Sequence, residues 1–120
     1  TCDLGNYAFN GCSSMKTATI GEQVTGIGEY AFSGCSSLAG IVIPNAVATL
    51  GQYAFSNCSA MKSVKIGNGI TSINDDTFSG CSSLPEIEIP QTVTSIGNYA
   101  FQNCAALEKI VLPDTGSSSI

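Results

Sequence analysis

The stretch VTSIGNYAFQNCAALEKIVLP, residues 93–113, repeats the order of residues found at 24–44, VTGIGEYAFSGCSSLAGIVIP. Two residue types mark this order along the chain at a constant interval of 23 residues: Phe9, Phe32, Phe55, Phe78 and Phe101, and Cys12, Cys35, Cys58, Cys81 and Cys104. A unit that recurs without insertion returns the chain to the same place on each pass, so equivalent side chains stack on one another. The period therefore predicts a solenoid.

The repeat divides the 120-residue chain into five units, residues 1–23, 24–46, 47–69, 70–92 and 93–115. We interpret residues 1–115 as one solenoid domain, and residues 116–120 as a tail or the start of a degenerate sixth repeat. Besides phenylalanine, three columns of equivalent positions stay aliphatic or methionine: Leu4, Ile27, Leu50, Ile73 and Ile96; Met15, Leu38, Met61, Leu84 and Leu107; and Ile20, Ile43, Ile66, Ile89 and Leu112. Stacked in this way, the columns predict a continuous core.

Within each unit the pattern L-x-x-I-x-I, as at residues 38–43 and 84–89, alternates apolar and polar residues with a period of two. That alternation predicts a short strand, and its copies should form a parallel sheet on one face, with about 4.8 Å between neighbours. A second short strand on a different side is expected at residues 24–27, 47–50, 70–73 and 93–96.

Two further columns accept only glycine or asparagine: Gly5, Gly28, Gly51, Asn74 and Gly97; and Gly11, Gly34, Asn57, Gly80 and Asn103. Both residue types tolerate a left-handed backbone, so we expect that conformation in both columns. Between the columns, residues 29–33 are expected to form one short helical turn that ends at Gly34.

The chain is acidic and poor in basic residues. Nine acidic residues against four lysines give a net charge of −5, and there is neither arginine nor histidine. Nucleic-acid binding is not expected, because phosphate neutralisation has almost no basic residues to use. The sequence has no run of 18 apolar residues, so membrane insertion is not expected in this segment. No signal peptide precedes Thr1, which implies either a cytosolic chain or one whose leader has been removed.

The unit V-T-S-I-G-x-Y-A-F-x-G-C-S-S-L-x-x-I-x-I-P resembles the BspA-like leucine-rich repeat family, the 23-residue, Treponema pallidum-type class of bacterial and protist surface proteins. The resemblance covers residues 1–115. It implies a leucine-rich-repeat solenoid of five right-handed coils, with a parallel β-sheet on one face and short helical turns opposite. It also implies a cell-surface or secreted protein that binds host proteins or other cells without catalysis. No binding residue carries over, because the family's contact positions lie in variable columns.

The cysteine column invites a chemical role, but its regularity favours a structural one. Neighbouring copies fall within the Cα range of a disulfide, yet parallel side-chain directions give poor geometry for a bridge. We expect a ladder of buried thiols that pack and donate weakly. Zinc binding and a cysteine nucleophile both lack a histidine partner. No pocket is predicted around the carboxylates of Glu86 and Glu88. We therefore expect no catalytic residue, cofactor or metal ion, and no enzyme activity.

Two places depart from the repeat. Cys2 falls in a column otherwise occupied by threonine or alanine. Its thiol either pairs with another chain or with a lost upstream segment, or is incidental and accessible, which we favour. Residues 74–77, NDDT, replace a Gly-x-Tyr-Ala order. They are either a calcium or ligand contact or, as a second interpretation, a helix-start cap or plain surface drift. We favour the second, because calcium needs six to eight oxygen ligands.

Two surfaces compete as a binding face. The tyrosines Tyr7, Tyr30, Tyr53 and Tyr99 should form a row away from the strands, either a recognition stripe or, as we favour, cover over the core. On the strands, the residue types in the outward-facing columns differ from unit to unit. We name these candidate protein-binding residues the strand face: Thr17, Thr19, Val42, Ser63, Lys65, Glu86, Glu88, Lys109 and Val111. Its opposite charges, Lys65 with Glu88 and Glu86 with Lys109, also predict cross-strand pairs worth about 0.2–1 kcal/mol each.

The sequence therefore predicts a non-catalytic protein-interaction module for adhesion or for host or cell-surface binding, with a protein ligand of unknown identity. The alternative is a structural spacer or self-assembly element that displays another domain. Val42, Val111 and the open ends of the solenoid are the candidates for self-association.

Overall fold

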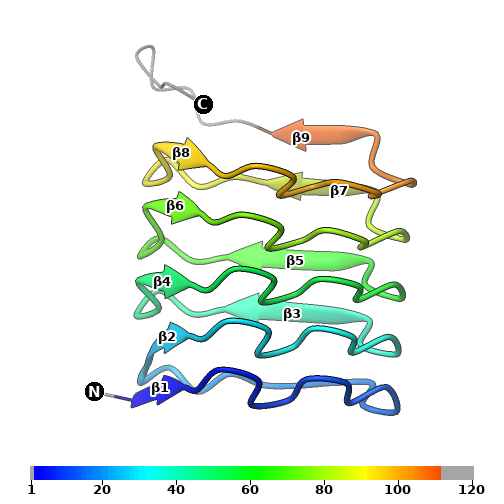
Figure 1. Ribbon diagram of the computed structural model, residues 1–120. Coiled ribbons are helices and arrows are strands. Elements are labelled where there is room, and N and C mark those ends of the chain that lie inside the picture. Colours follow the sequence, from blue (N-terminus) through cyan, green and yellow to red (C-terminus); the bar gives the residue numbers. More distant parts are fainter. Residues whose placement is uncertain (1, 112–120) are drawn as a thin grey trace.

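The computed structural model describes residues 2–111, with the backbone alone for Cys2 and Asp3. Two rows of short strands run along it (Figure 1). One row holds β1 (Cys2–Leu4), β2 (Val24–Ile27), β4 (Thr49–Leu50), β6 (Ser72–Ile73) and β8 (Ser95–Ile96), and the other holds β3 (Gly40–Ile43), β5 (Ser63–Ile66), β7 (Glu86–Glu88) and β9 (Lys109–Val111). Each pass of the chain lies beside the previous one, as in a solenoid. The predicted tail or sixth repeat at residues 116–120 lies outside the described residues.

Both predicted rows of strands are present, and their pairing is parallel. β3 shows why its row forms: Ile41 and Ile43 are buried and Val42 between them is exposed, as a side-chain period of two requires. β3 pairs with β5 so that equivalent residues of successive units lie opposite each other, as Ile43 does Ile66. In the first unit, residues 15–20 form no strand. That the coils number five and are right-handed stays a prediction.

The expected continuous sheet is divided between the third and fourth units. Strand pairing joins β1–β2–β4, β3–β5, β6–β8 and β7–β9, but joins neither β4 to β6 nor β5 to β7 among the described strands. In three units, one amide beside the second row donates to the preceding unit: Ala39, Lys62 and Glu108. Pro85 holds this position in the fourth unit and has no amide hydrogen to donate.

A second substitution accounts for the gap in the other row. Gly51 donates its amide to Ile27 O of the preceding unit, at 2.7 Å. At the equivalent place in the fourth unit the Leu50 carbonyl instead accepts a hydrogen bond from the side-chain Nδ2 of Asn74, at 2.6 Å. The side-chain amide thus takes the place of the backbone amide at this junction.

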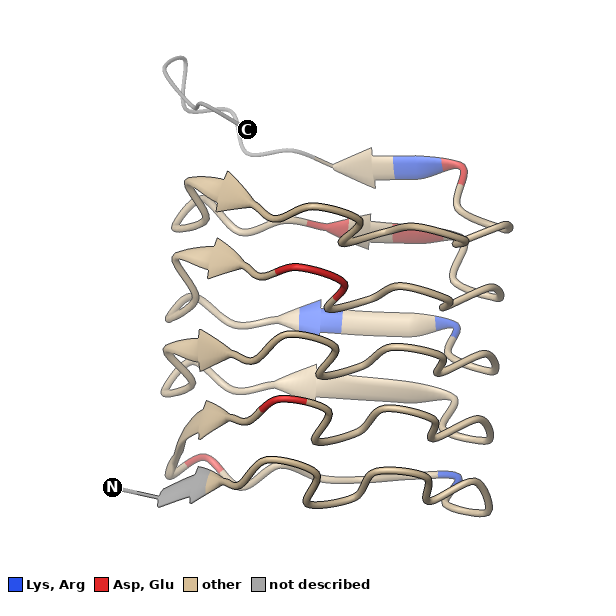
Figure 2. Cartoon of the chain, viewed as in Figure 1, with Lys and Arg blue, Asp and Glu red and all other residues tan. Residues whose placement is uncertain are grey.

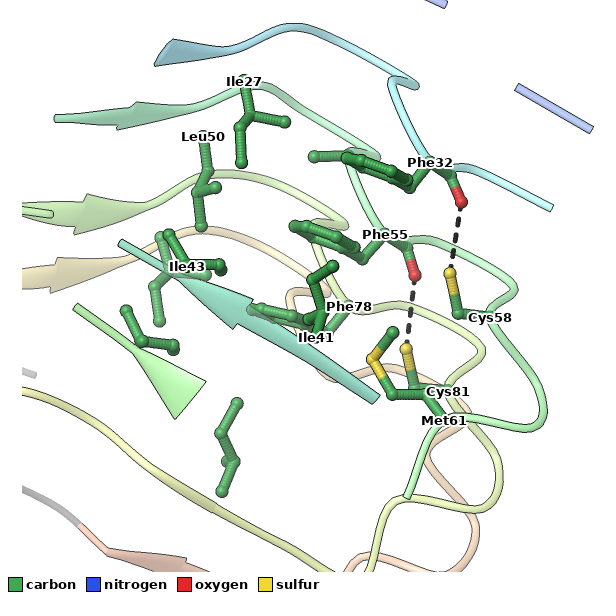
Figure 3. Close-up of a cluster of buried hydrophobic side chains, with 14 of the residues drawn as sticks. Ile27, Phe32, Ile41, Ile43, Leu50, Phe55, Cys58, Met61, Phe78 and Cys81 are labelled. Carbon is green, nitrogen blue, oxygen red and sulfur yellow. Dashed lines mark hydrogen bonds between the residues drawn. The ribbon is translucent and has the colours of Figure 1, made fainter. Parts of the chain in front are cut away.

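The core consists of the predicted stacked columns (Figure 3). Phe32, Phe55 and Phe78 are fully buried, and their ring centroids lie 5.2 and 5.6 Å apart. Leu50 and Met61 belong to the buried aliphatic columns on either side. Because the stack also passes from Phe55 to Phe78, the core is continuous where both rows of strands are interrupted.

The predicted helical turn at residues 29–33 is wrong. Tyr30 has a φ of 59°, which no right-handed helix contains. The segment forms overlapping turns, such as Ser33 N to Tyr30 O at 3.1 Å. The amides of Tyr30 and Phe32 donate to the next unit, Phe32 N to Ala54 O at 2.8 Å. An α-helix would need those amides for its own carbonyl groups.

The two glycine and asparagine columns have different causes. The second column is left-handed throughout, with φ of 77° at Gly11 and Gly34, 59° at Asn57, 80° at Gly80 and 62° at Asn103. That prediction is confirmed. The prediction for the first column is wrong, because its glycines have no positive φ. A Cβ on Gly28 would lie 2.7 Å from backbone atoms of Gly5 and Asn6, so close approach of adjacent units excludes a side chain there.

Candidate protein-binding face

The strand face lies on the outward side of the second row of strands, as the alternation predicts. Eight of its nine residues are exposed and Val111 is half-buried. β7 shows the arrangement: Glu86 and Glu88 point outward, while Ile87 between them is buried. Figure 2 shows this acidic strand between the lysines of β5 and β9.

The face changes character along the solenoid. The strand-face residues of its first part are uncharged and border a depression of about 330 Å³, whose lining includes Thr17, Thr19 and Val42 and also Lys16. Val42 is 59% exposed. The later part carries Lys65, Glu86, Glu88 and Lys109, which alternate in sign along the strand row (Figure 2). A partner that covers the whole face therefore meets an apolar area followed by a mixed-charge area.

The two predicted cross-strand pairs fall in different surroundings. Glu86 lies directly opposite Lys109 in the parallel pairing of β7 with β9. The Lys65 and Glu88 pair instead spans the interval between β5 and β7, where the strands are not hydrogen-bonded to each other. The structure thus places the first pair in register and leaves the second across the gap.

The tyrosine row stacks ring on ring. Tyr7 and Tyr30 have centroids 5.0 Å apart and Tyr30 and Tyr53 have centroids 4.7 Å apart, with planes within 3–4° of parallel. Tyr7 is 55% exposed and Tyr99 is 64% exposed. All four tyrosines have a positive φ, between 59° and 64°. Sequence reasoning missed this, because bulky aromatic residues rarely adopt a left-handed backbone. Whether the row is cover or a recognition stripe stays a prediction.

The described cysteines form the expected ladder of free thiols. The thiol of Cys58 donates to Phe32 O at 3.2 Å, and that of Cys81 donates to Phe55 O at 3.3 Å, each to the preceding unit (Figure 3). Desolvation by burial raises the pKa of Cys58 from 9.0 to about 12, and it raises the pKa of Cys81 as well. A thiol that keeps its proton is a poor nucleophile and metal ligand. The ladder is therefore structural.

Within residues 74–77, the side chains of Asn74, Asp75 and Thr77 make hydrogen bonds inside the protein. The carboxylate oxygen Oδ1 of Asp75 accepts a hydrogen bond from Asn98 N of the next unit, at 2.7 Å. Asn6 Oδ1 does the same for Glu29 N, at 2.8 Å. No helix begins at residues 74–77, so the predicted helix-start cap is wrong, and the capped group is a turn of the following unit. The recurrence of Asn or Asp at positions 6, 75 and 98 was the available signal.

Two further findings concern the described residues. Nowhere within residues 2–111 do three or more His, Cys, Asp or Glu side chains gather in a way that would hold a metal ion. The same residues contain no helix of sufficient length and apolarity to cross a bilayer. The backbone of Cys2, in β1, pairs with that of Val24 in β2. Its side chain lies outside the described atoms, so both interpretations of its thiol stay predictions.

The parallel strands, the 23-residue register and the stacked core define a leucine-rich-repeat solenoid. The family model for the BspA type leucine rich repeat region matches residues 3–119 in six copies, so the chain belongs to this family. Among curated proteins, none matches the sequence.

Several solved structures share the fold. The leucine rich repeat protein of T. pallidum is 32% identical, with a TM-score of 0.88 over 92% of this chain and 51% of that one. A leucine rich cell surface protein from Faecalibacterium prausnitzii is 28% identical, with a TM-score of 0.75 over 84% of this chain and 33% of that one. A leucine-rich repeat protein from Eubacterium ventriosum is 25% identical, with a TM-score of 0.83 over 94% of this chain and 33% of that one. This chain thus spans between a third and a half of their lengths.

Proposed function

We propose that this chain is a non-catalytic protein-interaction module that binds a protein partner through the strand face. The observation that supports it best is a contrast between columns. The columns that build the core and turns keep their chemistry from unit to unit, whereas the exposed columns of the strand face run from threonine and valine to lysine and glutamate. A surface with a distinct side chain at each step offers one partner a specific set of contacts.

We further propose that the protein acts at a cell surface or after secretion, in adhesion. Membership of the BspA-type family supports this, as does the similarity to a solved structure described as a leucine rich cell surface protein. The depression that includes Val42 is the expected centre of the contact, because it combines a concave surface with an exposed apolar side chain. Lys65 and Glu88 would then set the orientation of the partner.

The test is adhesion of beads coated with the purified chain to cultured epithelial cells under flow. The strand-face variant replaces Lys65, Glu86 and Glu88 with serine. We expect bead retention to fall about tenfold or more, since three charged contacts are lost together and a total loss of about 1.4 kcal/mol is already tenfold. Trypsin treatment of the cells should remove retention if the ligand is a protein.

A control variant replaces Gln23, Glu29 and Gln52 with serine. These residues are exposed and outside the strand face and its depression, and the change in net charge is the same. The control should retain beads like the unmodified chain. Equal losses in the two variants, or no loss in the first, would refute binding through the strand face.

The alternative function, a spacer or self-assembly element, has one observation in its favour. Phe9 in the first unit is 38% exposed, whereas the same column is fully buried at Phe55. An apolar hollow beside it includes Met15 and Val24. Sedimentation velocity between about 5 and 500 μM measures this alternative. Concentration-dependent growth that Phe9→Ser abolishes would support self-assembly, and a constant monomer would contradict it.

A further inference from the structure

One position in the tyrosine column lacks its ring. Asp76 stands where the other four units have tyrosine, and its φ of 58° matches the 59–64° of the tyrosines. The hydrogen bonds between units continue through this position, from Tyr53 N to Asp75 O at 3.2 Å and from Asp76 N to Asn98 O at 3.0 Å. The side chains at positions 53, 76 and 99 therefore leave equivalent points of the backbone in the same direction, one unit apart.

The missing ring leaves a gap between two aromatic side chains. Adjacent rings in this column are 4.7–5.0 Å apart, so two steps place the rings of Tyr53 and Tyr99 roughly 9–10 Å apart at this repeat spacing. Tyr99 is 64% exposed, so the gap is open to solvent on its side. One flat group fits between the two rings, and Asp76 supplies a carboxylate there.

The chemistry of this gap selects a cation. A positive charge midway would lie about 5 Å from each ring centroid, within the roughly 6 Å over which cation–π attraction acts. The Asp76 carboxylate raises the pKa of Tyr53 further above its ordinary value, first by its charge and then by a hydrogen bond, so this phenol adds no negative charge at physiological pH. The neighbouring carboxylate of Asp75 accepts a hydrogen bond from Asn98 N.

The shape of the gap selects among cations. The neighbouring rings of the column are within 4° of parallel, which suits a planar group that stacks on both sides. A guanidinium is planar, stacks on aromatic faces and pairs with carboxylates, whereas an ammonium is a compact point charge. This chain has no arginine to place there. We propose that Tyr53, Asp76 and Tyr99 form a binding site for the guanidinium group of an arginine on a protein partner.

The site lies away from the strand face and does not depend on it. Figure 2 shows the acidic stretch of the fourth unit on the near side of the solenoid, with β5 and β7 behind it. A partner bound both at the strand face and at this site would contact the solenoid on two sides. Loss of one site should therefore leave the other measurable.

The test is an NMR titration of the ¹⁵N-labelled chain with the blocked tripeptide acetyl-Gly-Arg-Gly-amide. Saturable shifts are expected at the amides of Tyr53, Asp76 and Tyr99. The citrulline analogue has the same shape without the charge and should give none. Asp76→Asn removes the charge and should weaken binding about tenfold, as for a charge-assisted contact. Asp76→Tyr refills the column with the residue of the other units, so it should fold normally and abolish binding.

Glu22→Gln is the matched control, because it removes the same charge from an exposed position in another unit. It should leave the titration unchanged. Equal weakening by Glu22→Gln and Asp76→Asn would show general attraction to an acidic chain and overturn the site. Binding that survives in Asp76→Tyr, or an absence of shifts up to about 20 mM peptide, would overturn it too. If acetyl-Gly-Lys-Gly-amide binds as well as the arginine peptide, the guanidinium assignment is wrong.

Discussion

The junction between the second and third units differs from the junction between the third and fourth. At the first, both rows of strands are paired, β2 with β4 and β3 with β5. At the second, Asn74 and Pro85 coincide with the loss of both pairings. The turn segments nevertheless bond across both junctions, as Phe32 N does to Ala54 O and Phe55 N to Thr77 O, each at 2.8 Å.

This difference distinguishes the interactions that every junction between units has from those that only some junctions have. Phenylalanine stacking, thiol hydrogen bonds and the turn-side amide bonds are present at every junction between fully described units from the second to the fourth. Strand pairing is absent from one of them. Unit stacking in this fold is therefore maintained by the core and the turn side even where the sheets are interrupted.

The largest effect should come from Phe55→Ala, which removes a ring that spans both junctions. A buried phenylalanine replaced by alanine costs about 3–5 kcal/mol, and urea unfolding followed by circular dichroism would measure the loss. Phe9→Ala is the control from the same column. Because Phe9 is 38% exposed, its loss should be clearly smaller, at about 1–2 kcal/mol. Equal losses would contradict the importance of the continuous core.

Gly51→Ala should break the intact junction. The new Cβ would collide with the backbone of Gly28 and Glu29, and overpacking of this kind costs about 1–3 kcal/mol. Gly51→Asn should cost about 1 kcal/mol less, because its side-chain amide can replace the lost hydrogen bond as Asn74 does. Gly21→Ala, with nothing within 4 Å of the new Cβ, should change stability little. A harmless Gly51→Ala would refute close approach as the reason for glycine.

The thiol ladder predicts the same alkaline instability at both junctions. The folded chain raises the pKa of Cys58 from 9.0 to about 12, so above pH 9 the unfolded chain releases this proton while the folded chain keeps it. Stability should fall as pH rises from 9 towards 12, by about 1.4 kcal/mol per pH unit for this group, and should not depend on it below pH 9.

Cys58→Ala should make that slope shallower by the contribution of this one group, as measured by urea unfolding at pH 8, 9.5 and 10. Cys81→Ala should act in the same direction, because burial raises the pKa of Cys81 as well. An unchanged slope in both variants would show that the thiols are not held protonated by the fold.

The smallest change in stability is expected for Pro85→Ala at the interrupted junction. The gain of one hydrogen bond, about 1 kcal/mol, is offset by the greater freedom of the unfolded chain without proline, about 0.4–1 kcal/mol. Hydrogen exchange is the sharper measurement. The amides of β7 should exchange about tenfold more slowly than in the unmodified chain, and the new amide at position 85 should be protected, if pairing with β5 is restored. Unchanged exchange in β7 would show that proline is not the cause of the gap.

Much of the fold follows from the 23-residue period, because repetition marks the core without reference to any other protein. The phenylalanine and cysteine columns and the alternation at Ile41, Val42 and Ile43 were sufficient for the core, the thiol ladder and both rows of strands. The turn side was not predictable in the same way. The segment 29–33 before Gly34 suggested a helical turn, but the left-handed backbone of Tyr30 accompanies hydrogen bonds to the next unit, which local propensity does not include.

The interruption of strand pairing at the fourth unit had a signal in the sequence, in two columns where a single residue differs from the rest. Pro85 alone in its column lacks an amide hydrogen, and Asn74 alone in its column carries a side chain. For the candidate face, alternation predicts which side chains point outward. The alternation does not identify a partner. Exposed columns vary between units both where a surface binds a partner and where nothing constrains it, and a single sequence does not distinguish these two causes.

The turn-side hydrogen bonds also give the solenoid an electrical polarity. The carbonyl of Glu29 accepts from Tyr7 N of the preceding unit, while the amide of the same peptide group, Tyr30 N, donates to Gln52 O of the following one. Successive peptide dipoles on this side therefore align along the solenoid axis, as they do along a helix. Strand amides such as Gly28 N, which donates to Leu4 O, point the other way and offset part of the sum. On the turn side, negative potential accumulates towards the first unit and positive potential towards the last, and each added repeat lengthens that dipole.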